Sequence, residues 1–184
     1  MDNPDSTREK DQEFARVVVT HRSAIQRYGL RRLEGNDEVE DLVAETFVVV
    51  WRHLDELPPR EEELFWLYGI AGRVLSNLRR SRERSLRLES RLALERELGQ
   101  EVPRFSKEDV EELLVAMGTL THDERELIQF AYWEKLSYRE IGMVLGCSEK
   151  AAGIRLSRAR RSLRQRLNRS TALIVALPLL RDEG

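Results

Sequence analysis

Apolar residues recur at intervals of three and four through most of this chain, and each such run predicts an amphipathic helix. One helix is expected at about 13–32, after a polar segment at 1–12 that is expected to be frayed. Two more are expected at 36–57 and 61–84. Because no run alternates between apolar and polar residues as a strand would, the pattern predicts an all-α fold.

The helical periodicity weakens in a charged stretch and then resumes, which indicates two small helical domains joined by a linker. At 184 residues the chain is long enough to give each domain a modest core. We expect an N-terminal domain at 1–84, a linker at 85–106, a C-terminal domain at 107–170 and a tail at 171–184. The tail is apolar, and packing on the C-terminal domain is favoured over contact with a partner.

The C-terminal domain contains the pattern of a helix-turn-helix motif. Ser137 and Glu140 can form a capping box that starts a short helix, and Gly146 can adopt the left-handed conformation that ends it. Ser148 can then cap a second helix, and residues 148–169 hold eight Lys or Arg against one acid. Such a helix suits a DNA phosphate backbone, whereas the alternative is a solvated arginine-rich helix. DNA binding is favoured because the basic run follows the turn.

The basic helix is expected to have a packing side and a DNA side. Lys150, Arg155 and Arg158 lie near the end that would enter a groove. Cys147, in the turn before the helix, is expected to pack rather than to act as a redox sensor. The expected packing residues of the helix are Ile154, Leu156, Ala159, Leu163 and Leu167.

Charge is unevenly distributed along the chain although the net charge is only −2. Residues 34–63 hold eleven acids and two arginines, whereas 73–84 holds five arginines and one acid. One explanation of the acidic run is a helix capped by Asn36 or Asp37, because the helix dipole stabilises carboxylates in the first turns. The valines at 48–49 broaden the apolar surface of the same helix, so a protein contact beside the acids is the other.

The helix expected at 61–84 is aromatic and apolar in its first half and basic in its second. Aromatic rings beside arginines suit single-stranded nucleic acid, in which bases stack on rings and cations follow the phosphates. The alternative is a core helix with a solvated basic end. These residues by themselves support the two interpretations equally.

The sequence shows no motif that indicates a catalytic or metal-binding site. One cysteine and three dispersed histidines form no metal-ligand cluster, and His21 is expected to be structural or solvated. No glycine-rich phosphate loop is present, so we expect no cofactor, no small-molecule substrate and no enzymatic activity. The segment 1–10 has no apolar region typical of secretion, and the longest apolar run, 172–180, is about half a membrane span. A cytoplasmic protein without a membrane contact is therefore expected.

Three blocks of the sequence resemble the extracytoplasmic-function (ECF) group of bacterial RNA polymerase sigma factors, in the order in which that family has them. The blocks are DEVEDLVAETFVVVW at 37–51, FWLYGIAGRVLSNLRR at 65–80 and LTHDERELIQFAYWEKLSYREIGMVLGCSEKAAGIRLSRARRSL at 120–163. The resemblance implies a factor that binds core RNA polymerase, directs it to specific promoters and helps to melt the minus-10 region. Many members are also held by an anti-sigma factor, although nothing in the sequence identifies one.

The resemblance also implies three groups of contact residues. Docking on core polymerase would use Asp37, Asp41, Glu45, Phe47 and Trp51. The minus-10 element would be held by Trp66, Arg73, Asn77, Arg79 and Arg80. The minus-35 element would be read in the major groove by Ser148, Glu149, Lys150, Ala151, Arg155 and Arg158.

Some positions depart from the family pattern. Arg73 stands where an asparagine is common, and Ala151 and Gly153 replace a usual threonine and lysine. Readout of the minus-35 element is therefore expected to depend more on Arg155, Arg158 and DNA shape than is usual. The alternative function is a helix-turn-helix repressor or activator with a helical sensing domain, which would need neither the acidic helix nor the aromatic and basic one.

Overall fold

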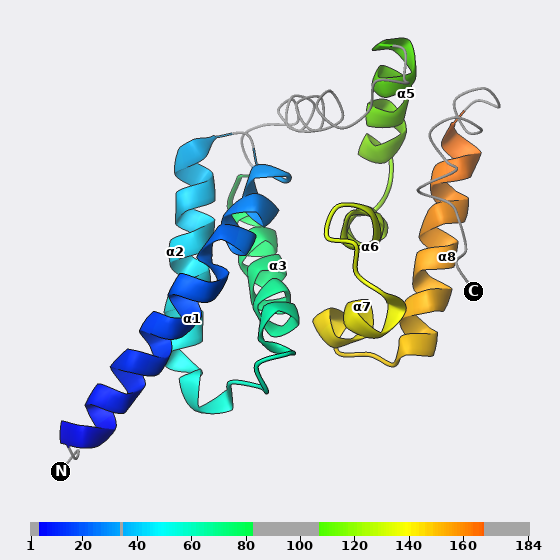
Figure 1. The fold of residues 1–184 in the computed structure, drawn as a ribbon. Coiled ribbons are helices and arrows are strands. Elements are labelled where there is room, and N and C mark those ends of the chain that lie inside the picture. The colour runs from blue at the N-terminus through cyan, green and yellow to red at the C-terminus, as the bar shows by residue number, and fades with distance from the viewer. Residues whose placement is uncertain (1–3, 34, 83–106, 168–184) are drawn as a thin grey trace. The chain divides into compact units, whose positions relative to one another are not determined.

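The computed structural model describes residues 4–33, 35–82 and 107–167. These residues form helices and turns and contain no strand, so the all-α prediction is confirmed. The chain divides into two compact units, Met1–Arg87 and Leu88–Gly184 (Figure 1). In chain order the helices are α1 (Pro4–Leu30), α2 (Asn36–Arg52), the 3-10 turn η1 (Leu54–Glu56), α3 (Glu63–Arg82), α5 (Lys107–Gly118), α6 (His122–Tyr132), α7 (Tyr138–Leu145) and α8 (Glu149–Arg166).

The first unit is built from α1, α2 and α3, each of which packs on the other two. Its apolar residues are spaced at three and four along each helix, so each helix presents one stripe to a shared core. The Tyr28 and Tyr68 rings lie in this core with their centroids 5.5 Å apart. Fully buried side chains of the core are Val17, Ile25, Tyr28, Leu42, Val50, Leu67 and Leu75.

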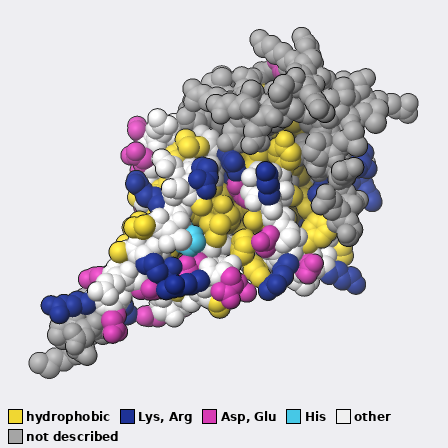
Figure 2. All heavy atoms as spheres, viewed as in Figure 1, with side chains coloured by type: hydrophobic (Ala, Val, Ile, Leu, Met, Phe, Trp, Pro, Cys, Tyr) yellow, Lys and Arg dark blue, Asp and Glu magenta, His cyan; other side chains and the backbone are white. Residues whose placement is uncertain are grey.

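Helix α1 begins at Pro4, so the prediction that residues 1–12 are frayed is wrong for 4–12. Proline is favoured at the first helical position because its fixed φ suits a helix and its missing N–H needs no partner there. Acidic and basic side chains are intermingled along the N-terminal part of α1 (Figure 2). The Lys10 ammonium also lies 3.0 Å from the Asp55 carboxylate in η1, an exposed ion pair whose contribution is small.

The start of α2 differs from the prediction that Asn36 or Asp37 caps it. The cap position is occupied by Gly35, which makes no side-chain hydrogen bond, and Asn36 is the first helical residue. Asp37 and Glu38 lie in the first turn, where their charge is favourable for the helix dipole. The helix ends at Arg52, and η1 occupies part of the region that the sequence assigned to its C-terminal end.

The second unit contains α6, α7 and α8, with α5 packed on α8. Ile141, Leu156 and Leu163 are fully buried between these helices. The Glu124 carboxylate has two roles, since it completes the capping box with Thr121 and accepts a hydrogen bond of 2.6 Å from the Ser162 hydroxyl on α8. The bond from Ser162 and those from Thr121 hold the pKa of Glu124 below its ordinary value. The start of α6 is thereby attached to α8.

Candidate nucleic-acid interface

The predicted helix-turn-helix is present between Ser137 and the end of α8, and its predicted caps are confirmed. The Ser137 hydroxyl accepts from the Glu140 amide at 3.3 Å, while the Glu140 carboxylate accepts from the Ser137 amide at 2.7 Å. Gly146 ends α7 with φ 62° and ψ 39°, the left-handed conformation that suits glycine. The Ser148 hydroxyl accepts from the Ala151 amide at 3.2 Å and so caps α8.

A second glycine of the motif, Gly142, was not found by reasoning from the sequence. The Cys147 amide donates to the Gly142 carbonyl at 2.9 Å, so the turn folds back onto α7. A Cβ atom at Gly142 would lie only 2.7 Å from the Cys147 carbonyl oxygen. The available signal was a glycine inside a helix, four residues before the turn glycine, at a helix-propensity cost of about 1 kcal/mol relative to alanine.

The residues predicted to read the minus-35 element lie on the N-terminal half of α8 and its cap. Alanine 151 is half-buried, and the others are exposed. The exposed members are Ser148, Glu149, Lys150, Arg155 and Arg158.

The packing side of α8 agrees with the prediction except at Ile154. Leu156, Ala159, Leu163 and Leu167 are buried, but Ile154 is 45% exposed. Successive helical residues are about 100° apart, so a residue two positions from Leu156 points about 200° away from it. The prediction that Ile154 packs is therefore wrong, because it belongs to the solvent side of α8.

The basic residues of α8 do not all face solvent. The Arg160 guanidinium donates to the Tyr138 hydroxyl at 3.2 Å and so joins α8 to α7. Arg160 is half-buried, whereas Arg155, Arg158 and Arg161 are exposed. The exposed cationic surface of α8 is therefore smaller than the count of its basic residues suggested.

Helix α3 places its predicted minus-10 residues in different environments. Arg73 and Asn77 are exposed, and Trp66 is half-buried. The half-buried Arg79 donates to the Arg32 carbonyl at 3.1 Å, so it also joins α3 to the segment after α1. Arg80 lies on the same helix. The first half of α3 is partly core, and the second half has exposed polar side chains, so the interpretation as a nucleic-acid contact stays a prediction.

Helix α2 presents most of its predicted docking residues to solvent. Asp37, Asp41 and Glu45 are exposed, and Trp51 is 44% exposed. Phe47 is only 6% exposed, and its ring packs edge-on against Phe14 of α1 at a centroid distance of 6.4 Å, so it lies in the core and does not fit a direct contact.

The large exposed apolar side chains of α2 are Val48 and Trp51, whereas Val49 is half-buried. Val48 is 42% exposed, as expected for a residue outside the packing stripe. Phe14 supports the Trp51 ring edge-on at a centroid distance of 5.1 Å. An aromatic side chain that is held in place and still exposed is typical of a protein contact.

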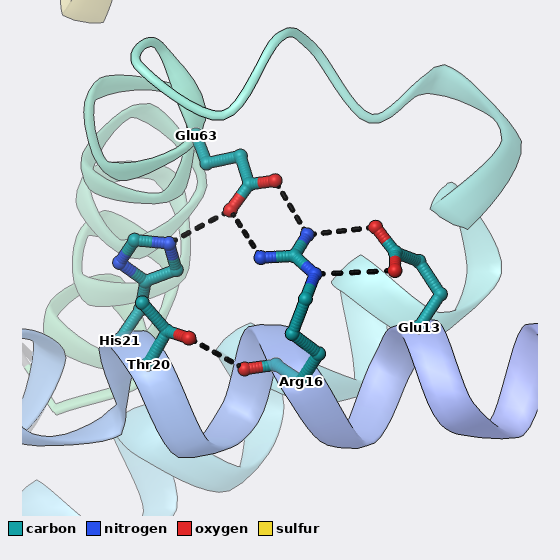
Figure 3. A network of polar contacts seen from close by, with 5 residues as sticks. All are labelled: Glu13, Arg16, Thr20, His21 and Glu63. Carbon is teal, nitrogen blue, oxygen red and sulfur yellow. Dashed lines mark hydrogen bonds and ion pairs between the residues drawn. The ribbon is translucent and has the colours of Figure 1, made fainter.

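A buried polar network joins α1 to the first residue of α3 (Figure 3). The Glu63 carboxylate is 1% exposed and lies between Arg16 and His21 of α1. Arg16 donates to both Glu63 oxygens, at 2.5 and 3.1 Å, and His21 Nε2 lies 2.9 Å from one of them. Arg16 also donates twice to Glu13, at 2.7 and 3.1 Å. His21 is therefore structural, as predicted.

The charges of this network stabilise one another. Burial raises the pKa of Glu63. The hydrogen bonds from Arg16 and His21 lower this pKa by more than burial raises it, so the net shift is downward. Hydrogen bonds to Glu13 and Glu63 raise the pKa of Arg16. The hydrogen bond from Arg16 lowers the pKa of Glu13. The network is thus an ionised cluster that fixes the N-terminal end of α3 on α1.

Comparison with known proteins gives a match in each unit. Sigma-70 region 2 matches residues 17–85, and Sigma-70, region 4 matches residues 110–163. The RNA polymerase sigma factor NccH of Alcaligenes xylosoxydans xylosoxydans is 28% identical, over 82% of this chain and 84% of NccH. The ECF RNA polymerase sigma factor SigL of Mycobacterium tuberculosis is also 28% identical, over 78% of this chain and 82% of SigL. The chain belongs to the ECF group of sigma factors.

Solved structures resemble this sigma factor as well. CnrH in complex with the cytosolic domain of CnrY has a TM-score of 0.57 and 28% identity, covering 89% of this chain and 88% of CnrH. RpoE in complex with the anti-sigma factor NepR from Bartonella quintana has a TM-score of 0.56 and 21% identity, covering 84% and 96%, and shows the fold alone. The predicted family is thus confirmed, while the contact residues stay predictions.

Two features are absent from the described residues of the sigma factor. No helix in the described ranges is long and apolar enough to cross a membrane. Among the same residues, no group of three or more His, Cys, Asp or Glu side chains is placed to hold a metal ion.

Proposed function

We propose that this sigma factor binds core RNA polymerase in the cytoplasm, directs it to specific promoters and helps to melt their minus-10 region, without enzymatic activity of its own. The observation that carries the proposal is the occurrence of Sigma-70 regions 2 and 4 in one chain. A helix-turn-helix repressor or activator would account for the second unit alone. The factor would act through binding free energy, and DNA would open only in the polymerase complex.

Core polymerase docking is proposed for α2. Exposed carboxylates at Asp37, Asp41 and Glu45 lie on the same helix as the apolar surface of Val48 and Trp51. An exposed aromatic anchor with charged residues around it is the usual composition of a protein interface. Phe47 contributes by holding this helix on α1 rather than by touching the polymerase.

Promoter contacts are proposed for α3 and α8. Exposed Arg73 and Asn77 support a role for α3 in holding the unpaired minus-10 strand, with Trp66 beside them on the helix. Exposed Lys150, Arg155 and Arg158 on a capped helix-turn-helix support major-groove binding at the minus-35 element.

An anti-sigma protein is proposed as a further partner. RpoE was solved with the anti-sigma factor NepR, and CnrH with the cytosolic domain of CnrY. The exposed apolar surface of α2 would be available to such a protein when polymerase is absent, because one surface cannot hold both partners.

The proposal is tested by reconstitution. The purified chain mixed with core RNA polymerase is expected to give promoter-dependent open complexes, measured by permanganate reactivity of unpaired thymines and by transcript start sites. The chain alone is expected to bind duplex DNA weakly and with strong salt dependence, since its net charge is −2. Tight, specific binding of duplex DNA by the chain alone, with no binding to core polymerase, would establish the repressor instead.

Separate contacts with DNA and polymerase are expected to respond to separate substitutions. Arg155→Ala is expected to weaken use of a minus-35-dependent promoter by roughly five- to 150-fold, the effect of about 1–3 kcal/mol, with core binding unchanged. Trp51→Ala is expected to weaken core binding. Arg22→Ala, which removes an exposed arginine from α1, is the charge-matched control for Arg155→Ala. It is expected to change neither promoter use nor core binding. Loss of core binding in Arg155→Ala would refute the assignment.

A further inference from the structure

Ile154 presents a large apolar side chain on the side of α8 that is proposed to face DNA. It is 45% exposed, whereas the helix's Ala152, Leu156 and Ala159 are buried. It lies in the second turn of α8, since Glu149 is the first helical residue. Residues in the first turns of a recognition helix are those that reach base edges. An apolar residue at this place is unexplained by the packing of the unit.

The residues one turn to either side of Ile154 are cations that suit contacts with DNA phosphates. Ile154 itself would then face the bases in the groove. Lys150 lies one turn before it and Arg158 one turn after it, and both are exposed. The residue before Ile154 is Gly153, and the space beside it is taken by the Tyr138 ring of α7, at 3.5 Å from a Cβ built there. Ala151, three positions earlier, is also small. Gly153 therefore faces α7, whereas Ile154, one position further round the helix, faces solvent.

The major groove offers one apolar group to such a side chain. Guanine, cytosine and adenine present hydrogen-bond donors and acceptors there, and only thymine adds a methyl group. Isoleucine has no polar atom in its side chain, so it cannot recognise a donor or an acceptor. It can gain free energy by covering a methyl group, since that contact removes apolar surface of both partners from water.

We propose that Ile154 is a specificity-determining residue that contacts the C5 methyl group of a thymine in the minus-35 element. The inference rests on the proposed function and adds a base preference to it. The exposed cations around Ile154 make DNA the occupant that this surface favours, because a protein partner would have to match a strongly positive patch. Arg155 and the flanking cations supply affinity and preference at other base pairs, and Ile154 supplies preference at one base pair.

The first step of the test is a selection. Holoenzyme assembled from the full chain and core polymerase is used to select promoter fragments in which the minus-35 duplex is randomised. The wild type is expected to enrich thymine at one fixed position. Ile154→Ser is expected to lose that enrichment while keeping the preferences at other positions, and Ile154→Val is expected to retain it.

The second step isolates the methyl group. The selected fragment is made with deoxyuridine in place of that thymidine, which removes one methyl group and leaves every hydrogen-bonding atom unchanged. Wild-type holoenzyme is expected to bind the substituted fragment about fourfold more weakly, the effect of one buried methyl group. Ile154→Ala holoenzyme is expected to bind both fragments equally. Val115→Ala, which shortens an exposed apolar side chain on α5, is the matched control and is expected to respond as the wild type does.

The outcomes separate this inference from the proposed function. Wild-type holoenzyme that selects minus-35 sequences but binds thymidine and deoxyuridine equally at every position overturns the inference alone. The same holds if Ile154→Ala keeps the full fourfold difference. If the chain fails to bind core polymerase and selects no sequence with it, the proposed function fails.

Discussion

Replacing Glu63 with alanine is expected to lower the free energy of unfolding of the N-terminal unit by about 1–3 kcal/mol, the cost of leaving buried hydrogen-bonding groups without a partner. The Glu63 carboxylate is 1% exposed and accepts hydrogen bonds from Arg16 and His21. Without it, His21 Nε2 and Arg16 Nη1 lose their acceptor, and Arg16 keeps only its hydrogen bonds to Glu13. The measurement is urea denaturation of the full chain, followed by tryptophan fluorescence, since Trp51 and Trp66 belong to this unit.

The matched control for Glu63 lies two residues earlier. Glu61 is exposed, and Glu61→Ala is expected to change the free energy of unfolding by no more than about 0.5 kcal/mol, as surface substitutions usually do. Glu63→Gln is expected to fall between the two, because the amide oxygen still accepts a hydrogen bond but carries no charge. Equal stability of Glu63→Ala and Glu61→Ala would show that the network does not stabilise the unit.

The stabilisation by Glu63 is also expected to depend on pH in a defined direction. Its pKa is lowered in the folded state from an ordinary value of 4.5. A group with a lowered pKa stabilises fully above its unfolded pKa and loses that contribution as the pH falls through the folded pKa. The difference in stability between wild type and Glu63→Gln should therefore shrink as the pH falls below 4.5. A difference that grows on acidification would contradict the ionised network.

Replacing Gly142 with alanine is expected to destabilise the C-terminal unit by about 1–3 kcal/mol, as overpacking does. The new Cβ would meet the Cys147 carbonyl oxygen at 2.7 Å and the Glu149 nitrogen at 3.4 Å. Both are backbone atoms, one in the turn and one at the first residue of α8, so no flexible side chain can give way. Helix propensity acts in the opposite direction, favouring alanine by about 1 kcal/mol, so any net loss comes from the contact.

The Gly142→Ala substitution is also expected to affect promoter use. Gly142→Ala holoenzyme is expected to use minus-35-dependent promoters poorly, because α8 can no longer sit correctly after the turn, while core binding through α2 is retained. Gly118→Ala is the matched control, since a Cβ at that position has nothing within 4 Å, and it is expected to be neutral. Urea denaturation and transcription from one promoter compare the two. A Gly142→Ala protein as stable and active as Gly118→Ala would refute the steric argument.

Local signals allowed the helix-turn-helix to be predicted in detail. The caps at Ser137, Gly146 and Ser148 depend on residues within four positions of one another, so the sequence contains all the information. Ile154 was misplaced because apolar character was taken for burial without following the angle of each residue around the helix. Gly142 was missed because its contact is with a turn whose path is known only after folding.

Long-range contacts could not be predicted in the same way. Glu63 lies 47 residues from Arg16 and 42 from His21, and no spacing rule connects such positions. The same limit applies to Phe47, whose apolar character fits either a surface contact or a core, and only the position of Phe14 decides between them. The resemblance to a family implied the roles of the helices, and the structure shows which side chains of each helix are exposed.

The distance along the chain between Arg16 and Glu63 also has a consequence during synthesis. A ribosome that adds 5–20 residues per second needs about 2–10 s to make the 47 residues between them. In that interval the nascent α1 contains Arg16 with its local partner Glu13, but the acceptor shared with His21 does not yet exist. The N-terminal unit can therefore close only after the first turn of α3 has left the ribosome. Slower translation would lengthen the time for which α1 has only α2 to pack against.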